Sequence, residues 1–314
     1  IFKENKVKEV LKKFSGFDNV KSIIGNCQYN YRNKVTLQVN EKIGYFMKKS
    51  NDIVEIDKCL IADKRINDII VNLQSIDLKG INQIVIRVTK NESMLIFYTV
   101  DNLKIDISKF TNVDTIIDIN FTKKILKGKG YIVDDIGNIK YVISPTSFYQ
   151  VNTNGMIKLY NKVLEYSKLE KTDSLLDLYC GTGTIGLYLA RYCNNVLGIE
   201  LNEEAISDAF KNKELNNINN IDFKVGDVGK VLNKTNFKPD VIVVDPPRAG
   251  LDNNTINHLI RLNPKRIVYV SCDVITLSRD LNILKNHFKI IEATPVDMFC
   301  NTHHVETVVI LERK

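Results

Sequence analysis

The chain has 314 residues, of which 44% are hydrophobic and 26% are charged. It carries no apolar run near the roughly 20 residues that a membrane span needs, so it is predicted to be a soluble globular protein, long enough for two domains. The six scattered cysteines lack the spacing of a disulfide framework, which favours reduced thiols and a cytoplasmic location. Because the sequence begins with Ile1, we expect it to belong to a longer protein.

The formal net charge of +7 is unevenly distributed along the chain. Residues 1–150 hold 24 Lys and Arg against 17 Asp and Glu, whereas residues 151–314 hold 20 of each. Such an excess is typical of a surface that contacts RNA or DNA. A solvated lysine-rich surface would give the same count.

The first half of the chain combines an amphipathic helix with a series of short β-like segments. Over residues 3–14, apolar side chains recur at helical spacing, namely Val7, Val10, Leu11 and Phe14. Further on, segments rich in β-branched and aromatic residues follow one another, with one helical pattern over 61–73. The predicted strands lie in "KVTLQV", "GYFMK", "QIVIRV", "SMLIFYTV", "GYIVDD" and "KYVIS". We predict an N-terminal helical segment over 1–28 and a basic α+β domain with a mostly antiparallel sheet over 29–143.

From Met156 onward, strand and helix patterns alternate, which is typical of a doubly wound parallel sheet. The last two strand patterns have no helix between them and predict an antiparallel pair at the sheet edge. Residues 144–314 are therefore expected to form a Rossmann-like α/β domain. The expected parallel strands lie in "SLLDLY", "VLGIE", "DFKVGD", "DVIVVD" and "RIVYVSC".

The stretch "LLDLYCGTGTIG" indicates a nucleotide-binding turn. Asp177 ends a strand, and Gly181 and Gly183 allow the backbone to approach a ligand before the next helix begins. The following strand ends in Glu200, where a carboxylate can accept hydrogen bonds from both ribose hydroxyls, and Asp227 ends the third strand. The glycine spacing by itself fits NAD as well as S-adenosylmethionine.

A second group of residues favours methyl transfer. In "VVDPPRAGL", Asp245 ends the fourth strand, and D-P-P loops at this place resemble those of methyltransferases that act on planar nitrogen or carbon. Cys272 ends the fifth strand and Glu306 begins the last one, so a thiol and a carboxylate could act as nucleophile and general base. Cysteine is also a common core residue, and a glutamate at a strand start is usually solvated. His303 and His304 have no partner cluster and are expected to be flanking polar residues rather than metal ligands.

Together these stretches resemble the RNA (uracil-5-)-methyltransferase family, of the RumA and TrmA type. The resemblance covers nearly the whole chain and implies a Rossmann-like S-adenosylmethionine-dependent methyltransferase domain with a smaller α+β central domain. It implies that Cys272 is the nucleophile and Glu306 the base, and that Asp245 lies closest to the uracil. It also implies that residues 1–28 pack against the catalytic domain, although they precede the basic domain in the sequence. The positions that match the cofactor pocket, beside the turn glycines Gly181 and Gly183, are Gln150, Tyr179, Thr184, Glu200, Asp227 and Asp245. The matching stretches are "YRNKV", "DIVEIDKC", "SFYQVN", "LDLYCGTGTIG", "VLGIE", "VVDPPRAG", "IVYVSCDVITLSRDL" and "HHVET".

The residues fit this chemistry in their own right. Uracil C5 is a poor nucleophile, but addition of a Cys272 thiolate to C6 would turn the ring into an enolate whose C5 can accept a methyl group. Glu306 would then remove the C5 proton, and the thiol would be eliminated. Since a free cysteine has a pKa of about 8.5, we expect a site that favours the thiolate.

Cys59 distinguishes two branches of the family. By resemblance it matches the fourth cysteine of the 4Fe–4S cluster in the ribosomal RNA branch, whereas the transfer RNA branch lacks the cluster. The other three cysteines would lie upstream of Ile1, as would a small RNA-binding domain, and Cys27 matches none of them. We expect the cluster in the full-length protein and not in this chain; core filling is the alternative role for Cys59.

The sequence therefore predicts a cytoplasmic, monomeric enzyme that uses S-adenosylmethionine to methylate uracil C5 in 23S ribosomal RNA, without a membrane partner. Three alternatives remain open: the same chemistry on transfer RNA, a non-catalytic RNA-binding protein with this fold, and an amino-methyltransferase. The last two would have no need for Cys272.

Overall fold

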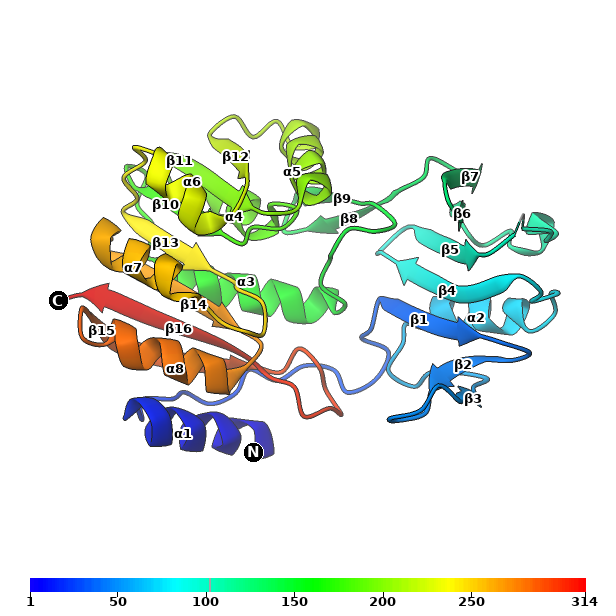
Figure 1. Cartoon of the computed structure of the whole chain (residues 1–314), viewed down its shortest axis with the longest axis horizontal. Helices are drawn as coiled ribbons and strands as arrows, with labels where there is room; N and C mark the ends of the chain where they lie inside the picture. The colour runs from blue at the N-terminus through cyan, green and yellow to red at the C-terminus, as the bar shows by residue number, and fades with distance from the viewer. Residues whose placement is uncertain (102) are drawn as a thin grey trace. The chain divides into compact units, whose positions relative to one another are not determined.

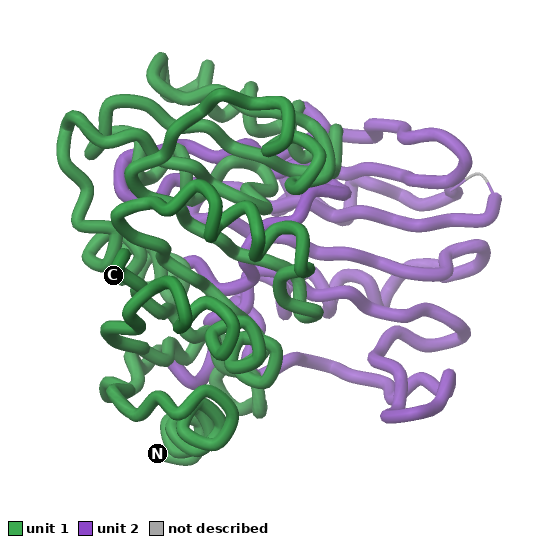
Figure 2. Tube along the Cα trace, turned by 60° about the vertical axis from the view of Figure 1, so that its left-hand side comes forward, with its two compact units in different colours: residues 1–26, 154–314 green, residues 27–153 purple. Residues whose placement is uncertain are grey.

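The computed structural model describes residues 1–101 and 103–314 and divides into two compact units. Unit 1 comprises residues 1–26 and 154–314, and unit 2 comprises residues 27–153 (Figure 2). Within the described residues, no helix is long and apolar enough to cross a membrane.

Unit 1 is built on a mixed sheet whose strands are β10 (Ser174–Leu178), β11 (Asn195–Glu200), β12 (Ile221–Val225), β13 (Val241–Val244), β14 (Arg266–Ser271), β15 (Phe288–Val296) and β16 (Glu306–Arg313). The strand order is β12-β11-β10-β13-β14-β16-β15 (Figure 1). The strands from β10 to β14 pair in parallel, and β16 runs antiparallel between β14 and β15. The α/β fold and the antiparallel final pair are thus as predicted.

Helices cover the sheet of unit 1: α1 (Phe2–Ser15), α3 (Thr153–Ser167), α4 (Thr184–Ala190), α5 (Glu203–Leu215), α6 (Val228–Lys234), α7 (Asn253–Leu262) and α8 (Val274–Leu284). Apolar residues of α1, α6, α7 and α8 share one core with the sheet. Side chains alternate between the two faces of a strand, so Leu176 and Leu178 enter this core while Asp177 points to the other face. There, Asp177 accepts a hydrogen bond from the Gly186 amide of α4 at 2.8 Å.

Helix α1 packs against α8 through one apolar stripe. Val7 and Leu11 are fully buried, and Ser15 continues the stripe one turn later. Gly16, with a φ of 71°, ends the helix in the left-handed conformation that glycine adopts without strain. Phe14 was predicted to lie on the buried stripe but is 50% exposed, because the i, i+4 series that starts at Val7 places Ser15 rather than Phe14 in the core.

The segment that follows α1 runs along β15. Val20 and Ile24 form parallel bridges to Ala293 and Val296. The Lys21 amide donates to the Ala293 carbonyl at 2.8 Å. The first 26 residues therefore complete the sheet side and the core of unit 1, although all of unit 2 separates them in sequence from the rest.

Unit 2 contains a second sheet, with strands β1 (Lys34–Val39), β2 (Ile43–Phe46), β3 (Ile53–Glu55), β4 (Ile81–Val88), β5 (Ser93–Thr99), β6 (Thr115–Ile119) and β7 (Lys123–Lys127). The order is β3-β2-β1-β4-β5-β6-β7, and only the β5–β6 pair is parallel within the described residues. Helix α2 (Lys64–Leu73) buries its apolar face on this sheet, β8 (Ile132–Ile136) and β9 (Ile139–Ile143) form a hairpin, and η1 (Ile107–Lys109) is a short 3-10 helix. The mostly antiparallel sheet was predicted, whereas β3, β6 and β7 were not.

The unit boundaries differ from the expected ones at residues 28 and 143. The structure divides the chain after residues 26 and 153, so the segment 144–153 belongs to unit 2 rather than to the second domain. Polar contacts explain this: buried Arg87 donates to the Ser147 carbonyl at 2.7 Å, and Asn33 donates to the Gln150 carbonyl at 3.1 Å.

The excess of positive charge is shared by the two units. Unit 2 holds 18 Lys and Arg against 14 Asp and Glu, while residues 1–26 hold 6 against 3. Part of the charge that the sequence suggested for an RNA-contacting central domain therefore lies in unit 1, on and around α1.

Candidate active site

The predicted catalytic and cofactor residues of unit 1 gather at one edge of its sheet. The carboxyl ends of parallel strands meet at the same edge, and ligands of α/β proteins bind there. Glu200 ends β11, Asp245 follows β13 and Cys272 follows β14. Because β16 is antiparallel to β14, its first residue, Glu306, lies at this edge as well.

The turn between β10 and α4 is shaped for close approach of a ligand. Tyr179, Gly181 and Gly183 all have positive φ, at 63°, 54° and 75°. A Cβ at Gly183 would come within 2.7 Å of the Phe223 ring, so only glycine fits there. The Gly181 amide donates to Glu200 Oε2 at 3.1 Å, which ties the turn to the neighbouring strand.

The donor and acceptor groups at this turn fit a nucleoside. Glu200 accepts backbone N–H groups at Oε2 and, from Asn202, at Oε1 (2.9 Å), and each carboxylate oxygen can accept one more hydrogen bond, as ribose hydroxyls require. Asp177 Oδ1 is buried with no hydrogen-bond partner among the described residues. Burial raises the pKa of Asp177 to about 8, and the charges of Asp245 and Glu200 add to this effect. An acidic edge of this kind also suits a cationic ligand such as a sulfonium.

The remaining predicted cofactor residues are placed differently. The Thr184 hydroxyl accepts a hydrogen bond from Tyr160 at 2.7 Å. Asp227 does not end β12 but caps α6, where it accepts the Lys230 amide at 3.0 Å. Gln150 lies in unit 2, so its assignment to the cofactor pocket stays a prediction.

Strand register brings Cys272 and Glu306 together. Ser271 of β14 pairs with Thr307 of β16, and the next residue outward on each strand is Cys272 or Glu306. Residues opposite each other in an antiparallel pair present their side chains on the same face. Cys272 is half-buried and Glu306 is only 5% exposed.

The acidic groups around the thiol oppose its ionisation. Burial raises the pKa of Cys272 to about 11, helped by the charges of Glu306 and Asp245 and opposed by Arg248. Our expectation that the free site favours a thiolate is therefore wrong, because desolvation and two neighbouring carboxylates outweigh one guanidinium. Burial likewise raises the pKa of Glu306 to about 8, with a further contribution from Asp245, and the pKa of Asp245 to about 7. Carboxyl groups that titrate near neutral pH are suited to general acid–base catalysis.

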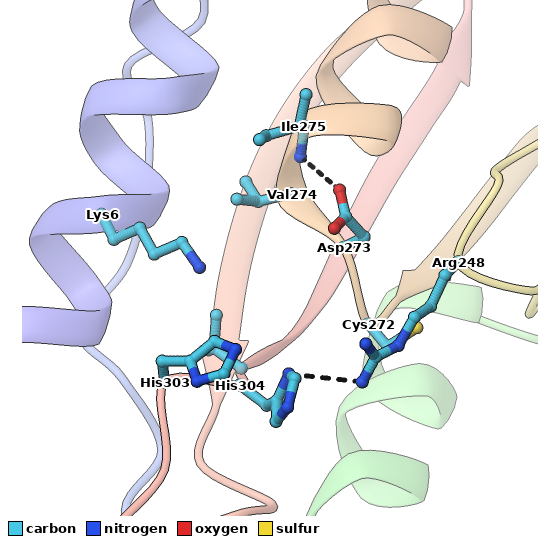
Figure 3. A pocket seen from close by; sticks show the side chains of 9 residues that line it. Lys6, Arg248, Cys272, Asp273, Val274, Ile275, His303 and His304 are labelled. Atoms are coloured by element: carbon cyan, nitrogen blue, oxygen red, sulfur yellow. Dashed lines mark hydrogen bonds between the residues drawn. The ribbon is translucent and has the colours of Figure 1, made fainter. Parts of the chain in front are cut away.

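A small basic pocket adjoins Cys272 and was not predicted (Figure 3). Arg248 reaches into it from the loop after β13, and its Nη2 lies 3.3 Å from His304 Nδ1. Arg248 is part of "DPPRAG", and His303 and His304 are part of "HHVET", two of the stretches that carry the family resemblance. No pattern in the sequence indicated a role for Arg248. The lining residues are Lys6, Arg248, Cys272, Asp273, Val274, Ile275, His303, His304 and Val305.

Cys59 lies in unit 2 between β3 and α2, where its amide donates to Asn67 Oδ1 at 2.8 Å. In the part of the chain that the structure describes, no three His, Cys, Asp or Glu side chains are grouped so that they could hold a metal ion. The role of Cys59 in an iron–sulfur cluster stays a prediction.

Comparison with known proteins shows similarity over almost the whole chain. Residues 96–225 and 228–314 match the tRNA (uracil-5-)-methyltransferase family. An uncharacterized RNA methyltransferase of Clostridium tetani is 36% identical over 99% of this chain and 77% of its own length. One from Oceanobacillus iheyensis is 38% identical over 99% of this chain and 78% of its own length.

Solved structures show the same likeness. The tRNA (uracil-54, C5)-methyltransferase of Pyrococcus abyssi, solved with S-adenosyl-L-homocysteine, has a TM-score of 0.85 and 31% identity, over 99% of this chain and 83% of that one. A putative S-adenosylmethionine-dependent methyltransferase of Streptococcus mutans, at a TM-score of 0.52 and 13% identity over 73% of this chain and 71% of that one, shares the fold.

Proposed function

The chain belongs to the tRNA (uracil-5-)-methyltransferase family, and we propose that it methylates uracil C5 in RNA through a covalent bond between Cys272 and uracil C6. The observation that carries the proposal is the β14–β16 register, which sets a thiol and a buried carboxylate opposite each other at the ligand-binding edge of the sheet. A non-catalytic RNA-binding role would leave this costly buried carboxylate without a purpose.

Cys272 is the nucleophile of the proposed reaction. Its thiolate adds to C6, and the electron pair of the C5–C6 double bond moves into the enolate, which makes C5 nucleophilic. Because the pKa of Cys272 is about 11, the thiol must give up its proton to solvent before it adds. Bound S-adenosylmethionine supplies the methyl group and a positive sulfonium, which favours the thiolate. Elimination releases the sulfur as a thiolate, which takes a proton back from solvent in the free site.

Glu306 is the base of the second half of the reaction. Once C5 carries the methyl group, the C5 proton must leave so that the C–H electron pair can restore the double bond and the C6–S bond can break. A carboxylate with a pKa of about 8 is a stronger base than an ordinary glutamate, and its charge is available above that pH. Loss of this proton to solvent resets the site.

The cofactor residues of the proposal lie mainly in the β10–α4 turn and at the ends of β11 and β13. Glu200 would accept the ribose hydroxyls, and Gly181 and Gly183 would let the backbone approach the nucleoside. Asp245 would lie next to the reacting ring. Tyr179, Thr184 and Asp227 complete the part of the proposed pocket that unit 1 supplies.

We propose 23S ribosomal RNA as the substrate of a cytoplasmic, monomeric enzyme. The support is the resemblance of Cys59 to a cluster ligand of the ribosomal RNA branch, and the 4Fe–4S cluster belongs to this proposal for the full-length protein. Transfer RNA is the second candidate, since the Pyrococcus abyssi protein is described as a tRNA (uracil-54, C5)-methyltransferase. Mass mapping of methylated uridines in both RNA classes, from cells with and without the gene, decides between them.

Trapping of the covalent adduct tests the mechanism. Glu306→Gln should add to RNA and methylate it but fail to release it, leaving a protein–RNA band on a denaturing gel. Cys272→Ala should give no band and no methylation, while the matched control Cys193→Ala, a buried cysteine elsewhere in unit 1, should behave as wild type. Methylation by Cys272→Ala would refute the covalent mechanism.

A further inference from the structure

The basic pocket beside Cys272 draws its side chains from segments far apart in sequence. Lys6 comes from α1, Arg248 from the loop after β13, and His303 and His304 from the loop before β16 (Figure 3). In the figure, Lys6 and Arg248 extend toward the pocket from opposite sides, with the two histidines below them. All of these residues belong to unit 1.

Lys6 differs from the other basic residues in the first two turns of α1. Lys3 forms an ion pair with Asp297 at 2.6 Å and also donates to the Phe299 carbonyl at 2.8 Å. Lys8 pairs with Glu4 at 2.6 Å. Lys6 is partly buried, yet no carboxylate of the described residues lies within 4 Å of its ammonium. A partly desolvated charge without a counter-ion is unfavourable, so an anion from outside the chain would be bound there.

Arg248 adds a second positive charge to the pocket, near enough to Glu306 to favour the charged form of that carboxyl. Its guanidinium has no carboxylate within 4 Å among the described residues, and its side-chain contact is with His304. The rings of His303 and His304 lie 4.0 Å apart. Burial lowers the pKa of His304, and the positive charges of His303, Arg248, Lys6 and Lys3 lower it further, which reports a positive potential in the pocket.

Asp273 contributes a carboxylate to the lining, but that group is engaged in capping a helix. Its Oδ1 accepts the amides of Ile275 and Thr276 at 2.9 and 3.1 Å, at the start of α8. Its negative charge therefore offsets the helix dipole. The two side-chain cations across the pocket keep their capacity to bind an anion.

The size of the pocket limits the ligand to a single small group. Its volume is about 90 Å³, well below the roughly 300–1,000 Å³ of pockets that enclose a whole small molecule. A uracil ring is uncharged at neutral pH and would leave both cations unpaired. A phosphate matches the charge, and guanidinium and ammonium groups bind phosphate oxygens strongly.

We propose that Lys6, Arg248 and the His303–His304 pair form a phosphate-binding subsite that holds the RNA backbone next to the uracil attacked by Cys272. This inference rests on the proposed function, because Cys272 lines the same pocket and a nucleotide seated on its thiol brings a phosphodiester with it. It makes α1, which precedes unit 2 in the sequence, part of the RNA-binding surface of unit 1.

The test compares lysines of α1 by the salt dependence of RNA binding. Lys6→Gln is measured against Lys12→Gln, which removes the same charge from an exposed position two turns further along, and against Lys6→Arg, which keeps the charge. The probe is fluorescent decauridylate, and affinity is followed from low to physiological salt. For a single strand, each phosphate that the protein no longer neutralises lowers the slope of log K against log salt by about 0.7.

Lys6→Gln should lower the low-salt affinity by about three- to tenfold and reduce the slope by about 0.7, while Lys12→Gln and Lys6→Arg stay close to wild type. The melting temperature of Lys6→Gln should not fall below that of wild type, since Lys6 makes no ion pair in the described structure and its partly desolvated charge is unfavourable. Equal slopes for Lys6→Gln and Lys12→Gln would overturn the subsite, as would wild-type binding that does not depend on salt.

The binding assay does not require methyl transfer, so failure of the phosphate site and failure of the proposed function can be told apart. If the wild type transferred no methyl group to RNA but Lys6→Gln still changed the slope, the proposed function would fail and the phosphate site would stand. If methyl transfer occurred and Lys6→Gln matched Lys12→Gln in both slope and methylation rate, only the phosphate site would fail. A further probe is decauridylate in which one phosphate is replaced by an uncharged methylphosphonate. It should reduce the slope of log K against log salt more for wild type than for Lys6→Gln, because only wild type keeps the Lys6 charge that binds a phosphate.

Discussion

Ser271 and Thr307 are directly paired across β14 and β16, at the end of the ladder nearest the ligand-binding edge. Because these two residues are paired, the residues just beyond them on each strand lie opposite each other. They are Cys272, with a half-buried thiol, and Glu306, with a buried carboxyl. Their proximity explains why the Glu306 charge raises the pKa of Cys272. The catalytic pair thus follows from backbone hydrogen bonding rather than from a flexible loop.

The first prediction concerns the reactivity of Cys272 toward iodoacetamide. With a pKa of about 11, only about one thiol in ten thousand is ionised at pH 7, so alkylation should speed up roughly tenfold per pH unit up to pH 10. At pH 9, Glu306→Gln should react faster than wild type because a neighbouring negative charge is gone. At pH 6 the two should match, since Glu306 is then protonated. Peptide mass spectrometry separates Cys272 from exposed Cys27; a fast, pH-independent rate would contradict the raised pKa.

The second prediction concerns stability against pH. The folded-state pKa of Glu306, about 8, lies above its ordinary value of 4.5, so this group stabilises the fold fully below pH 4.5 and progressively less as pH rises through 8. Glu306→Gln cannot ionise, and its melting temperature should exceed that of wild type by a margin that grows between pH 5 and pH 9. Glu312→Gln on the same strand should instead lower the melting temperature at neutral pH. Hydrogen bonding to Lys168 lowers the pKa of the Glu312 carboxyl, so its charged form stabilises the fold at that pH. A margin that is constant with pH would show that Glu306 is not desolvated.

The third prediction separates backbone strain from steric clash at the two glycines of the β10–α4 turn. An alanine Cβ at position 181 meets no atom within 4 Å. Gly181→Ala should nevertheless lower the free energy of unfolding by about 1–2 kcal/mol, because the backbone φ of 54° is in the left-handed region. Gly183→Ala has the same unfavourable backbone φ and also places a methyl group 2.7 Å from the Phe223 ring. It should therefore lower the free energy of unfolding by about 1–3 kcal/mol more than Gly181→Ala does. Thermal melting of both variants measures the difference. Equal losses would mean that Phe223 moves aside freely.

The fourth prediction tests the cofactor pocket. Glu200→Ala should weaken S-adenosylmethionine binding by about 1.5–3 kcal/mol in calorimetry, the range for hydrogen bonds to a charged group. Exposed Glu203, at the start of α5, provides the control, and Glu203→Ala should bind as wild type does. Because Glu200 also holds the Gly181 and Asn202 amides, melting must accompany the titration. Unchanged affinity in a folded Glu200→Ala protein would remove this residue from the pocket.

The fifth prediction concerns unit 2. Lys123 and Lys124 are exposed on β7, the last strand of its sheet. If they bind RNA phosphates, the Lys123→Gln, Lys124→Gln double variant should reduce the salt slope of RNA binding by about 0.7 for each phosphate that is no longer neutralised. Replacing Lys234 and Lys238, which are exposed in unit 1, gives the charge-matched control. Identical slopes for the two double variants would assign unit 2 another role.

Sequence patterns predicted the α/β fold of unit 1 because the strands from β10 to β14 are short runs, most of them buried, that are each followed by a helix. They also placed Glu200, Asp245 and Cys272 at strand ends, since local sequence determines where a strand stops. The weakly apolar strand "KKILK" was missed, because its exposed lysines give no buried face. The raised pKa of Cys272 could not be predicted either, because it depends on which carboxyl groups the fold brings near.

Lys6 illustrates the same limit. Its position on an amphipathic helix could be predicted, but that the helix would lie beside Cys272 depends on contacts between residues hundreds of positions apart. No periodicity carries that information.

The strand β16 comes after all other strands of its sheet in the sequence, yet it is an interior strand of that sheet. During translation, β14 and β15 therefore emerge before the strand that joins them. Helix α1 is made before unit 2, whereas its partner α8 is made well after it. Unit 2, in contrast, is continuous and can fold while the ribosome is still making unit 1. Since Glu306 is the first residue of β16, a chain cut short before that strand would lack both the closed sheet and the base. Such an incomplete chain would be inactive rather than trapped on RNA, because the missing strand also supports Cys272.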